Sequence, residues 1–174
     1  MKKIFFIILI TPMFLNAQFM NPSIGAYAGI GEMKGNSPSL SVYSLNGYIG
    51  FYAWFSADIE FRTGFFYAQK IENLIPENRA GKFYPFIKGY YLSANISQFF
   101  NDTFFLEEGV GIIIINDRIY NDRASWDIGA KAHLAAGFRL KQNLRISGGI
   151  DFASTVTNTS ASYLIYMVQT QYYF

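Results

Sequence analysis

His133 is the residue best suited to acid–base chemistry in this sequence, because it is the single histidine and its side chain titrates near neutral pH. On an extended strand it shares a face with Lys131, and Ser147 and Asp151 share a face of the segment that follows. A serine, a histidine and a carboxylate can together form a nucleophilic site. A lone histidine among charged residues belongs more often to an ion-pair network, so we expect no catalytic residue here.

A larger set of charged residues recurs at alternate positions of several segments and is expected to face one shared interior. The acids of this set are Asp58, Glu60, Glu107, Asp127 and Asp151. The bases are Arg62, Lys70, Lys131, Arg139 and Arg145, with His133 among them. Equal numbers of each sign predict a self-compensating network, since an unpaired buried charge is far more costly than a paired one. A narrow path for ions or solutes through the same residues is the alternative.

Cofactor and metal chemistry has little support in the sequence. Cysteine is absent, which excludes disulfides and thiolate metal sites. No phosphate-binding loop, metal-ligand cluster or nucleotide fingerprint occurs. We therefore expect neither a cofactor nor a bound metal.

Short segments of alternating hydrophobicity, separated by turn residues, must position these charges. No helical period of useful length is present, so the fold class is all-β with about eight antiparallel strands. The predicted strands cover residues 23–32, 40–52, 57–70, a fourth ending near 97, a fifth ending near 115, 126–140, 144–152 and 160–174. Short turns are expected at residues 53–56, 101–102 and 141–143.

The alternation falters at three places. Strand two changes parity near Tyr43 to Leu45, Glu108 falls on the apolar parity of strand five, and Lys88 falls there in strand four. A β-bulge or the entry into a loop would explain each irregularity. The sequence does not decide between them.

The first residues have the pattern of a secretory leader. Lys2 and Lys3 precede an apolar run, and Ala17 is a small residue suited to cleavage. We predict a signal peptide over residues 1–17 and one β-barrel domain over 18–174; a membrane anchor is the competing interpretation. Cleavage takes two of the 14 basic residues and leaves 12 against 12 acidic ones, so no nucleic-acid partner is expected.

Two features favour a membrane barrel over a soluble one. Strands three, six, seven and eight carry outward apolar bands long enough to span a bilayer at roughly 9–11 residues per tilted strand. Aromatic residues also gather at both strand ends, as at the two membrane interfaces. One group is Trp54, Phe55, Phe99, Phe100, Phe104, Phe138, Tyr172 and Phe174. The other group is Tyr67, Phe83, Tyr84, Tyr120 and Trp126.

The C-terminal alternation of Tyr166, Val168, Thr170, Tyr172 and Phe174 resembles the insertion signal of outer-membrane barrels. The mature chain resembles the small OmpA- and OmpX-like barrels. The run from Phe105 to Gly109 is similar to one in the porin-like "outer membrane protein beta-barrel domain" family. This resemblance implies an up-and-down meander in a Gram-negative outer membrane, reached through the periplasm. It also implies contact with outer-membrane lipid, with lipopolysaccharide and, during insertion, with the barrel-assembly machinery.

The loop from Asn116 to Arg123 repeats the triplet Asn-Asp-Arg. Its oxygens could hold a divalent cation, and its arginines could meet lipopolysaccharide phosphates. Ordinary turn chemistry explains Asn-Asp equally well, and we favour it.

The function that we expect is a non-enzymatic barrel with a filled, ion-paired lumen that contributes to envelope integrity or surface interaction. The main alternative is an accessory subunit of a larger outer-membrane complex, in contact with other outer-membrane proteins. A narrow channel and a lipid-modifying enzyme that uses His133 are further alternatives.

Overall fold

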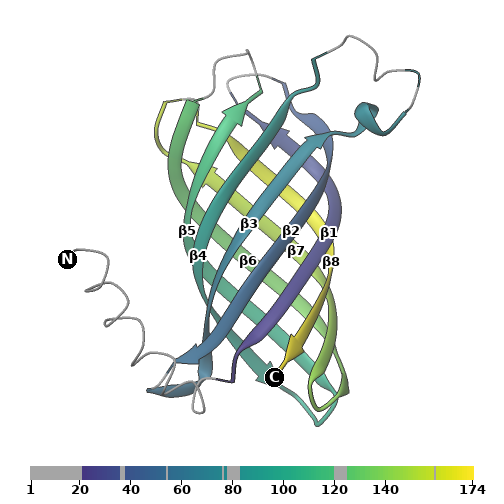
Figure 1. The fold of residues 1–174 in the computed structure, drawn as a ribbon, viewed down its shortest axis with the longest axis vertical. Helices are drawn as coiled ribbons and strands as arrows, with labels where there is room; N and C mark the ends of the chain where they lie inside the picture. Colours follow the sequence, from purple (N-terminus) through teal and green to yellow (C-terminus); the bar gives the residue numbers. More distant parts are fainter. Residues whose placement is uncertain are drawn as a thin grey trace, which may run out of the picture.

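Eight antiparallel strands close into one barrel in the computed structural model (Figure 1). The structure describes residues 21–35, 38–53, 55–75, 77, 83–119, 125–158 and 160–174. The strands are β1 (Ser23–Lys34), β2 (Leu40–Ala53), β3 (Ser56–Lys70), β4 (Phe86–Phe99), β5 (Phe104–Arg118), β6 (Ser125–Lys141), β7 (Leu144–Thr155) and β8 (Ser162–Tyr173). The predicted all-β, eight-stranded meander is confirmed.

Each strand pairs with its neighbour in the chain, and the first pairs with the last. The β1–β8 register runs from Ser23 opposite Tyr173 to Lys34 opposite Ser162. Closure leaves no sheet edge, so the backbone hydrogen-bonding groups of every strand are satisfied within the sheet. A short 3₁₀ helix, η2 (Ile71–Leu74), follows β3. Within the described ranges, no helix has the length and apolar character needed to cross a membrane.

The two ends of the barrel differ. The short connections β2–β3, β4–β5 and β6–β7 lie at one end, together with the start of β1 and the C-terminus; we call this the turn end (Figure 1). The other four connections form the loop end. At the β4–β5 turn, the side-chain oxygen of Asn101 accepts hydrogen bonds from the backbone N–H groups of Thr103 (2.9 Å) and Phe104 (2.6 Å). The predicted turns are therefore found where the sequence placed them.

A β-bulge, one of the two explanations left open for the three irregular places, is found at none of them. Pairing is continuous through Tyr43–Leu45, Lys88 and Glu108. The register shifts instead between Tyr52 and Ala53 in the β2–β3 pair, and between Arg139 and Lys141 in the β6–β7 pair, both beside short turns. Lys88 and Glu108 thus face outward, in step with their strands.

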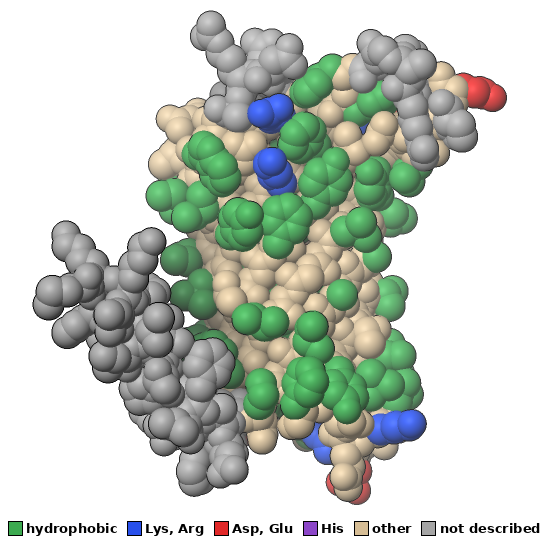
Figure 2. Space-filling view, in the orientation of Figure 1, with side chains coloured by type: hydrophobic (Ala, Val, Ile, Leu, Met, Phe, Trp, Pro, Cys, Tyr) green, Lys and Arg blue, Asp and Glu red, His purple; other side chains and the backbone are tan. Residues whose placement is uncertain are grey.

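The outer wall is apolar and carries large side chains toward both ends (Figure 2). Exposed and less exposed residues alternate along β6 as far as Leu140 and along the whole of β8, as expected for a wall with two different environments. Exposed aromatic residues of the turn end include Phe55, Phe100, Phe138 and Phe174. Phe83 and Trp126 are exposed toward the loop end, whereas Tyr84 is buried and Phe99 points into the mouth of the barrel. Trp54 and Tyr120 lie outside the described residues.

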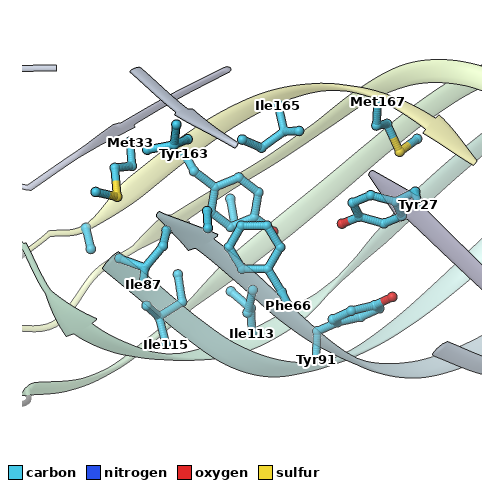
Figure 3. Packing of buried hydrophobic residues seen from close by; sticks show 14 of the residues in the cluster. Tyr27, Met33, Phe66, Ile87, Tyr91, Ile113, Ile115, Tyr163, Ile165 and Met167 are labelled. Atoms are coloured by element: carbon cyan, nitrogen blue, oxygen red, sulfur yellow. The ribbon is translucent and has the colours of Figure 1, made fainter. Parts of the chain in front are cut away.

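The interior has two halves. Toward the turn end it holds charged and polar side chains, described below. Toward the loop end it holds an apolar plug of buried residues from most strands (Figure 3). The ring of Phe66 stacks on that of Tyr163 at the centre of the plug, with ring centroids 4.1 Å apart. The other labelled members toward this end are Met33, Ile87, Ile113, Ile115 and Ile165.

Candidate functional site

Arg62 is the centre of the buried polar half. Its Nη2 lies 2.6 Å from Glu60 Oε2 and 2.5 Å from Glu107 Oε2, and its Nη1 lies 2.7 Å from Glu107 Oε1. These three side chains are at most 3% exposed. Glu60 and Arg62 are alternate residues of β3 and so share its inner face, while Glu107 comes from β5. The bidentate contact with Glu107 is the geometry in which a guanidinium binds a carboxylate most strongly.

Asp151 is the centre of a second cluster of buried side chains. It accepts hydrogen bonds from Lys131 Nζ and from the hydroxyl of Tyr27, both at short range, and from the hydroxyl of Tyr163 at 3.1 Å. Lys131 also lies over the ring of Tyr91, with its Nζ 4.7 Å from the ring centroid. Asp151 therefore has a cation and two hydroxyl donors to offset the loss of water around it.

His133 joins the two clusters. Its Nε2 lies 2.9 Å from Glu107 Oε1, and its Nδ1 lies 3.7 Å from Asp151 Oδ1. Both ring nitrogens thus face carboxylates, and no hydrogen bond between His133 and Ser147 is found among the described residues. The void beside His133 measures about 10 Å³, room for one water molecule at most. A substrate has no space next to this histidine.

Neutral side chains complete the hydrogen bonding of the carboxylates. Ser23 Oγ donates to Glu60 over 2.5 Å, and Gln171 Nε2 donates to the same carboxylate over 2.8 Å. Gln169 Nε2 donates to Glu107 over 3.2 Å. Ser23, Gln169 and Gln171 carry no charge and were not among the predicted lumen residues. Their signal was available, because Gln169 and Gln171 lie on the inner parity of β8.

The remaining predicted lumen residues lie apart from these clusters. Asp127 is buried toward the loop end and accepts a hydrogen bond from Thr157 Oγ1 over 3.1 Å. Lys70 lies at the loop end and pairs with Glu72 over 3.0 Å. Arg139 and Arg145 lie at the turn end. Asp58 has the inward parity of β3 but is exposed, because it lies where the strand emerges at the turn end; its inclusion in a buried network is wrong.

The Asn-Asp-Arg triplet that is described has a structural role. Asp117 is buried, and its Oδ1 accepts a hydrogen bond from the backbone N–H of Ile119 over 2.7 Å. This is the turn chemistry that the sequence favoured. The second triplet, residues 121–123, lies outside the described residues. Among the described residues, no group of three or more histidines and carboxylates is arranged to hold a metal ion.

Comparison with known proteins identifies the fold. The sequence matches no protein-family model and no curated protein. Among solved structures, Neisserial surface protein A is similar over 88% of this chain and 97% of its own, with a TM-score of 0.73 and 11% identity. The N-terminal barrel domain of Pseudomonas aeruginosa OprF has a TM-score of 0.57 at 11% identity, over 88% of this chain and 98% of that domain.

A third similar structure is Ail, the attachment invasion locus protein of Yersinia pestis, in complex with the heparin analogue sucrose octasulfate. The similar region covers 89% of this chain and 99% of the Ail chain, with a TM-score of 0.54 and 13% identity. At such low identities the likeness concerns the fold alone. The chain has the eight-stranded, up-and-down barrel fold of the small outer-membrane proteins.

Proposed function

We propose that this protein is a non-enzymatic barrel of the bacterial outer membrane, with a sealed lumen, and that it contributes to envelope integrity or surface interaction. The observation that carries the proposal is the filling of the interior. The ion-paired clusters around Arg62 and Asp151 occupy the half toward the turn end, and the apolar plug around Phe66 and Tyr163 occupies the other half. A solute that enters from either end meets tightly packed side chains.

An outer-membrane location is supported by the apolar wall, by the aromatic residues toward both ends and by the fold of the similar structures. Export by a leader over residues 1–17 stays a prediction, because these residues lie outside those described. In such barrels the short turns and both termini lie in the periplasm. The turn end would then face the periplasm and the loop end the exterior, in contact with lipopolysaccharide.

Catalysis is disfavoured by the surroundings of His133, whose nitrogens face Glu107 and Asp151 rather than a nucleophile. A His133→Ala strain is expected to have the same lipid A profile by mass spectrometry as its parent. Loss of a modified lipid A species in that strain would contradict a non-enzymatic role.

A deletion strain of the source organism tests the envelope role. We expect increased uptake of a hydrophobic fluorescent dye and increased sensitivity to detergent, because a rigid apolar-walled barrel is removed from the membrane. Wild-type protein and the His133→Ala variant should both restore the barrier. Normal dye uptake and normal detergent sensitivity in the deletion strain would refute a role in envelope integrity and leave the surface contacts of the loops to be tested by cell-binding assays.

One observation favours a second candidate function, an accessory subunit of a larger complex. Glu108 is exposed on the outer wall and faces Ile96 on one neighbouring strand and Leu134 on the other, both also exposed. It lies four residues from Phe104, whose ring packs against Phe138 at the turn end. Four residues of a tilted strand rise roughly 10 Å along the barrel axis, which places this carboxylate beside lipid chains.

Lys88, an outward charge on β4, needs no partner. It is the third residue of β4 at the loop end, half-buried, where a long side chain can reach the membrane interface. The side chain of Glu108 is shorter and lies deeper, so it cannot reach the membrane interface. A transmembrane segment of another protein that offers a cation or an N–H donor at that depth would satisfy the carboxylate.

Co-purification from native membranes in mild detergent tests this second candidate. A Glu108→Leu variant should lose the partner, while the Lys88→Gln control should keep it. In lipid vesicles without a partner, Glu108→Leu should stabilise the isolated barrel by up to about 2 kcal/mol, because a carboxylate facing lipid is removed. Equal recovery of every associated protein by wild type and Glu108→Leu would refute the idea.

A further inference from the structure

We propose that a pocket at the turn end of the barrel binds a small oxyanion, a phosphate or carboxylate group, through Arg139 and Arg145. The pocket is about 800 Å³ in volume and opens at the end where β1 begins and β8 ends. The filled lumen forms its floor. The proposal does not depend on the function proposed above.

The two arginines place like charges side by side. Arg139 of β6 and Arg145 of β7 are direct partners in the antiparallel register, so their side chains leave the sheet as neighbours. Both guanidinium groups lie against the ring of Phe99, with distances of 4.1 Å and 4.9 Å from the carbon atom at the centre of each group to the ring centroid. Like charges directly opposite each other destabilise a strand pair. An anion between them would reverse that effect.

Neither arginine has a carboxylate partner among the described residues, in contrast to Arg62, Lys131 and Lys70, each of which is paired with an acid. Arg145 is only 7% exposed. Within the described residues, its hydrogen bonds go to neutral hydroxyl groups: Tyr173 at 2.8 Å, Tyr52 at 3.3 Å and Ser97 at 3.4 Å. When all the partners of a buried guanidinium are neutral, most of its positive charge stays uncompensated.

Both arginines also have hydrogen-bonding capacity to spare. The Nε of Arg139 and the Nε of Arg145 are buried, and neither has a hydrogen-bond partner within the part of the chain that the structure describes. A guanidinium carries five N–H donors in a planar fork that fits two oxygens of a carboxylate or phosphate. Phe99 and Tyr173 hold the guanidinium groups in place, since the Arg145 group also lies 4.3 Å from the centroid of the Tyr173 ring. The rings thus position the cations and leave N–H groups for a ligand.

The chemistry of the pocket selects an oxyanion and leaves two sources open. Besides Tyr52 and Tyr173, the lining includes neutral polar side chains that add donors, namely Asn21, Ser56, Gln142 and Asn143. A soluble phosphate or carboxylate compound can enter through the mouth. The outward rings of Tyr172 and Phe174 also belong to the lining, so the phosphate of a phospholipid headgroup in the adjoining leaflet can reach the same site.

Titration of pyrophosphate into the full-length barrel in an uncharged maltoside detergent tests the proposal. Binding is measured by calorimetry at about 150 mM salt, where attraction between exposed charges is largely screened. We expect saturable binding that Arg139→Gln and Arg145→Gln each weaken about tenfold or more, because each removes charge-assisted hydrogen bonds. Arg118→Gln is the matched control: Arg118 lies over Phe86 at the opposite end, and its Nε also has no hydrogen-bond partner among the described residues. Its loss should leave binding unchanged.

A second comparison separates the two sources of the anion. In nanodiscs of phosphatidylcholine with phosphatidylglycerol, a headgroup in the site would weaken pyrophosphate binding about tenfold relative to the detergent measurement. Unchanged affinity would instead assign the site to soluble anions. The proposal is overturned if no saturable binding is found at millimolar pyrophosphate, or if Arg139→Gln and Arg145→Gln bind as wild type does. Arg139 is the more accessible of the two, so its variant remains informative if Arg145→Gln fails to fold.

Discussion

Replacement of Arg62 by methionine should destabilise the barrel by about 3–5 kcal/mol, the usual cost of removing one partner from a buried ion pair. The size of this effect comes from the two carboxylates that remain. Glu60 and Glu107 both lie within 2.6 Å of Arg62 Nη2 and are 2% and 0% exposed. Without Arg62 they would lie close together in a space that water barely enters.

Two further variants separate charge from packing. In the triple variant Glu60→Gln/Arg62→Met/Glu107→Gln no charge remains unpaired, so most of the lost stability should return. The control Lys70→Met breaks the exposed pair with Glu72, in which the side chains are 27% and 51% exposed. Its loss should cost at most about 1 kcal/mol.

Urea unfolding of the barrel in phospholipid vesicles measures these differences through intrinsic tryptophan fluorescence, to which the lipid-facing Trp126 contributes. A loss in Arg62→Met no larger than that in Lys70→Met would refute the reasoning that the buried pairs hold the lumen together. A triple variant as unstable as Arg62→Met would show that lost packing, rather than unpaired charge, causes the effect.

Gly31→Ala should lower the folded fraction, seen as a heat-modifiable band in SDS gels, because the new Cβ would collide with the backbone carbonyl oxygen of Leu164. The control Gly47→Ala should fold normally, because a Cβ at that position meets open space. Equal folded fractions in the two variants would contradict this prediction. Phe66→Ala should cost about 3–5 kcal/mol in urea unfolding because it opens the apolar plug, and the lipid-exposed Phe65→Ala should cost clearly less; the reverse order would refute the plug. Phe174→Ala should slow assembly into the outer membrane without lowering stability, because this side chain is 75% exposed; unchanged assembly in pulse-chase experiments would reject the proposed insertion signal.

The period-two pattern predicted most of the wall correctly, because each strand separates lipid from lumen. Strand β6 is the clearest case: Trp126, Ile128 and Leu134 face outward, while Lys131 and His133 face inward, as the sequence indicated. The pattern fails where both environments are apolar. In β2 the plug buries Val42, so an apolar inward residue resembled an outward one and gave a false change of parity near Tyr43.

Which charged side chains of the lumen contact one another depends on the curvature and closure of the sheet. Neither property can be predicted from local sequence spacing. Arg62 and Glu107 meet although they belong to β3 and β5, which are not adjacent in the sheet. Local spacing placed both on inner faces but did not relate them. The four consecutive residues Ile112–Ile115 give a signal for the plug, since a run that is apolar on both parities indicates an apolar interior at that level.

Conductance across planar lipid bilayers tests most directly whether the interior of this barrel is closed to ions. Folded full-length protein, verified as heat-modifiable in SDS gels, is delivered from vesicles and the current is recorded under an applied voltage. The packed clusters around Arg62 and Asp151 and the plug around Phe66 predict a current that stays at the bilayer baseline. Stable, repeatable conductance steps that scale with the amount of inserted barrel would contradict the sealed lumen and would make the charged interior a conduit.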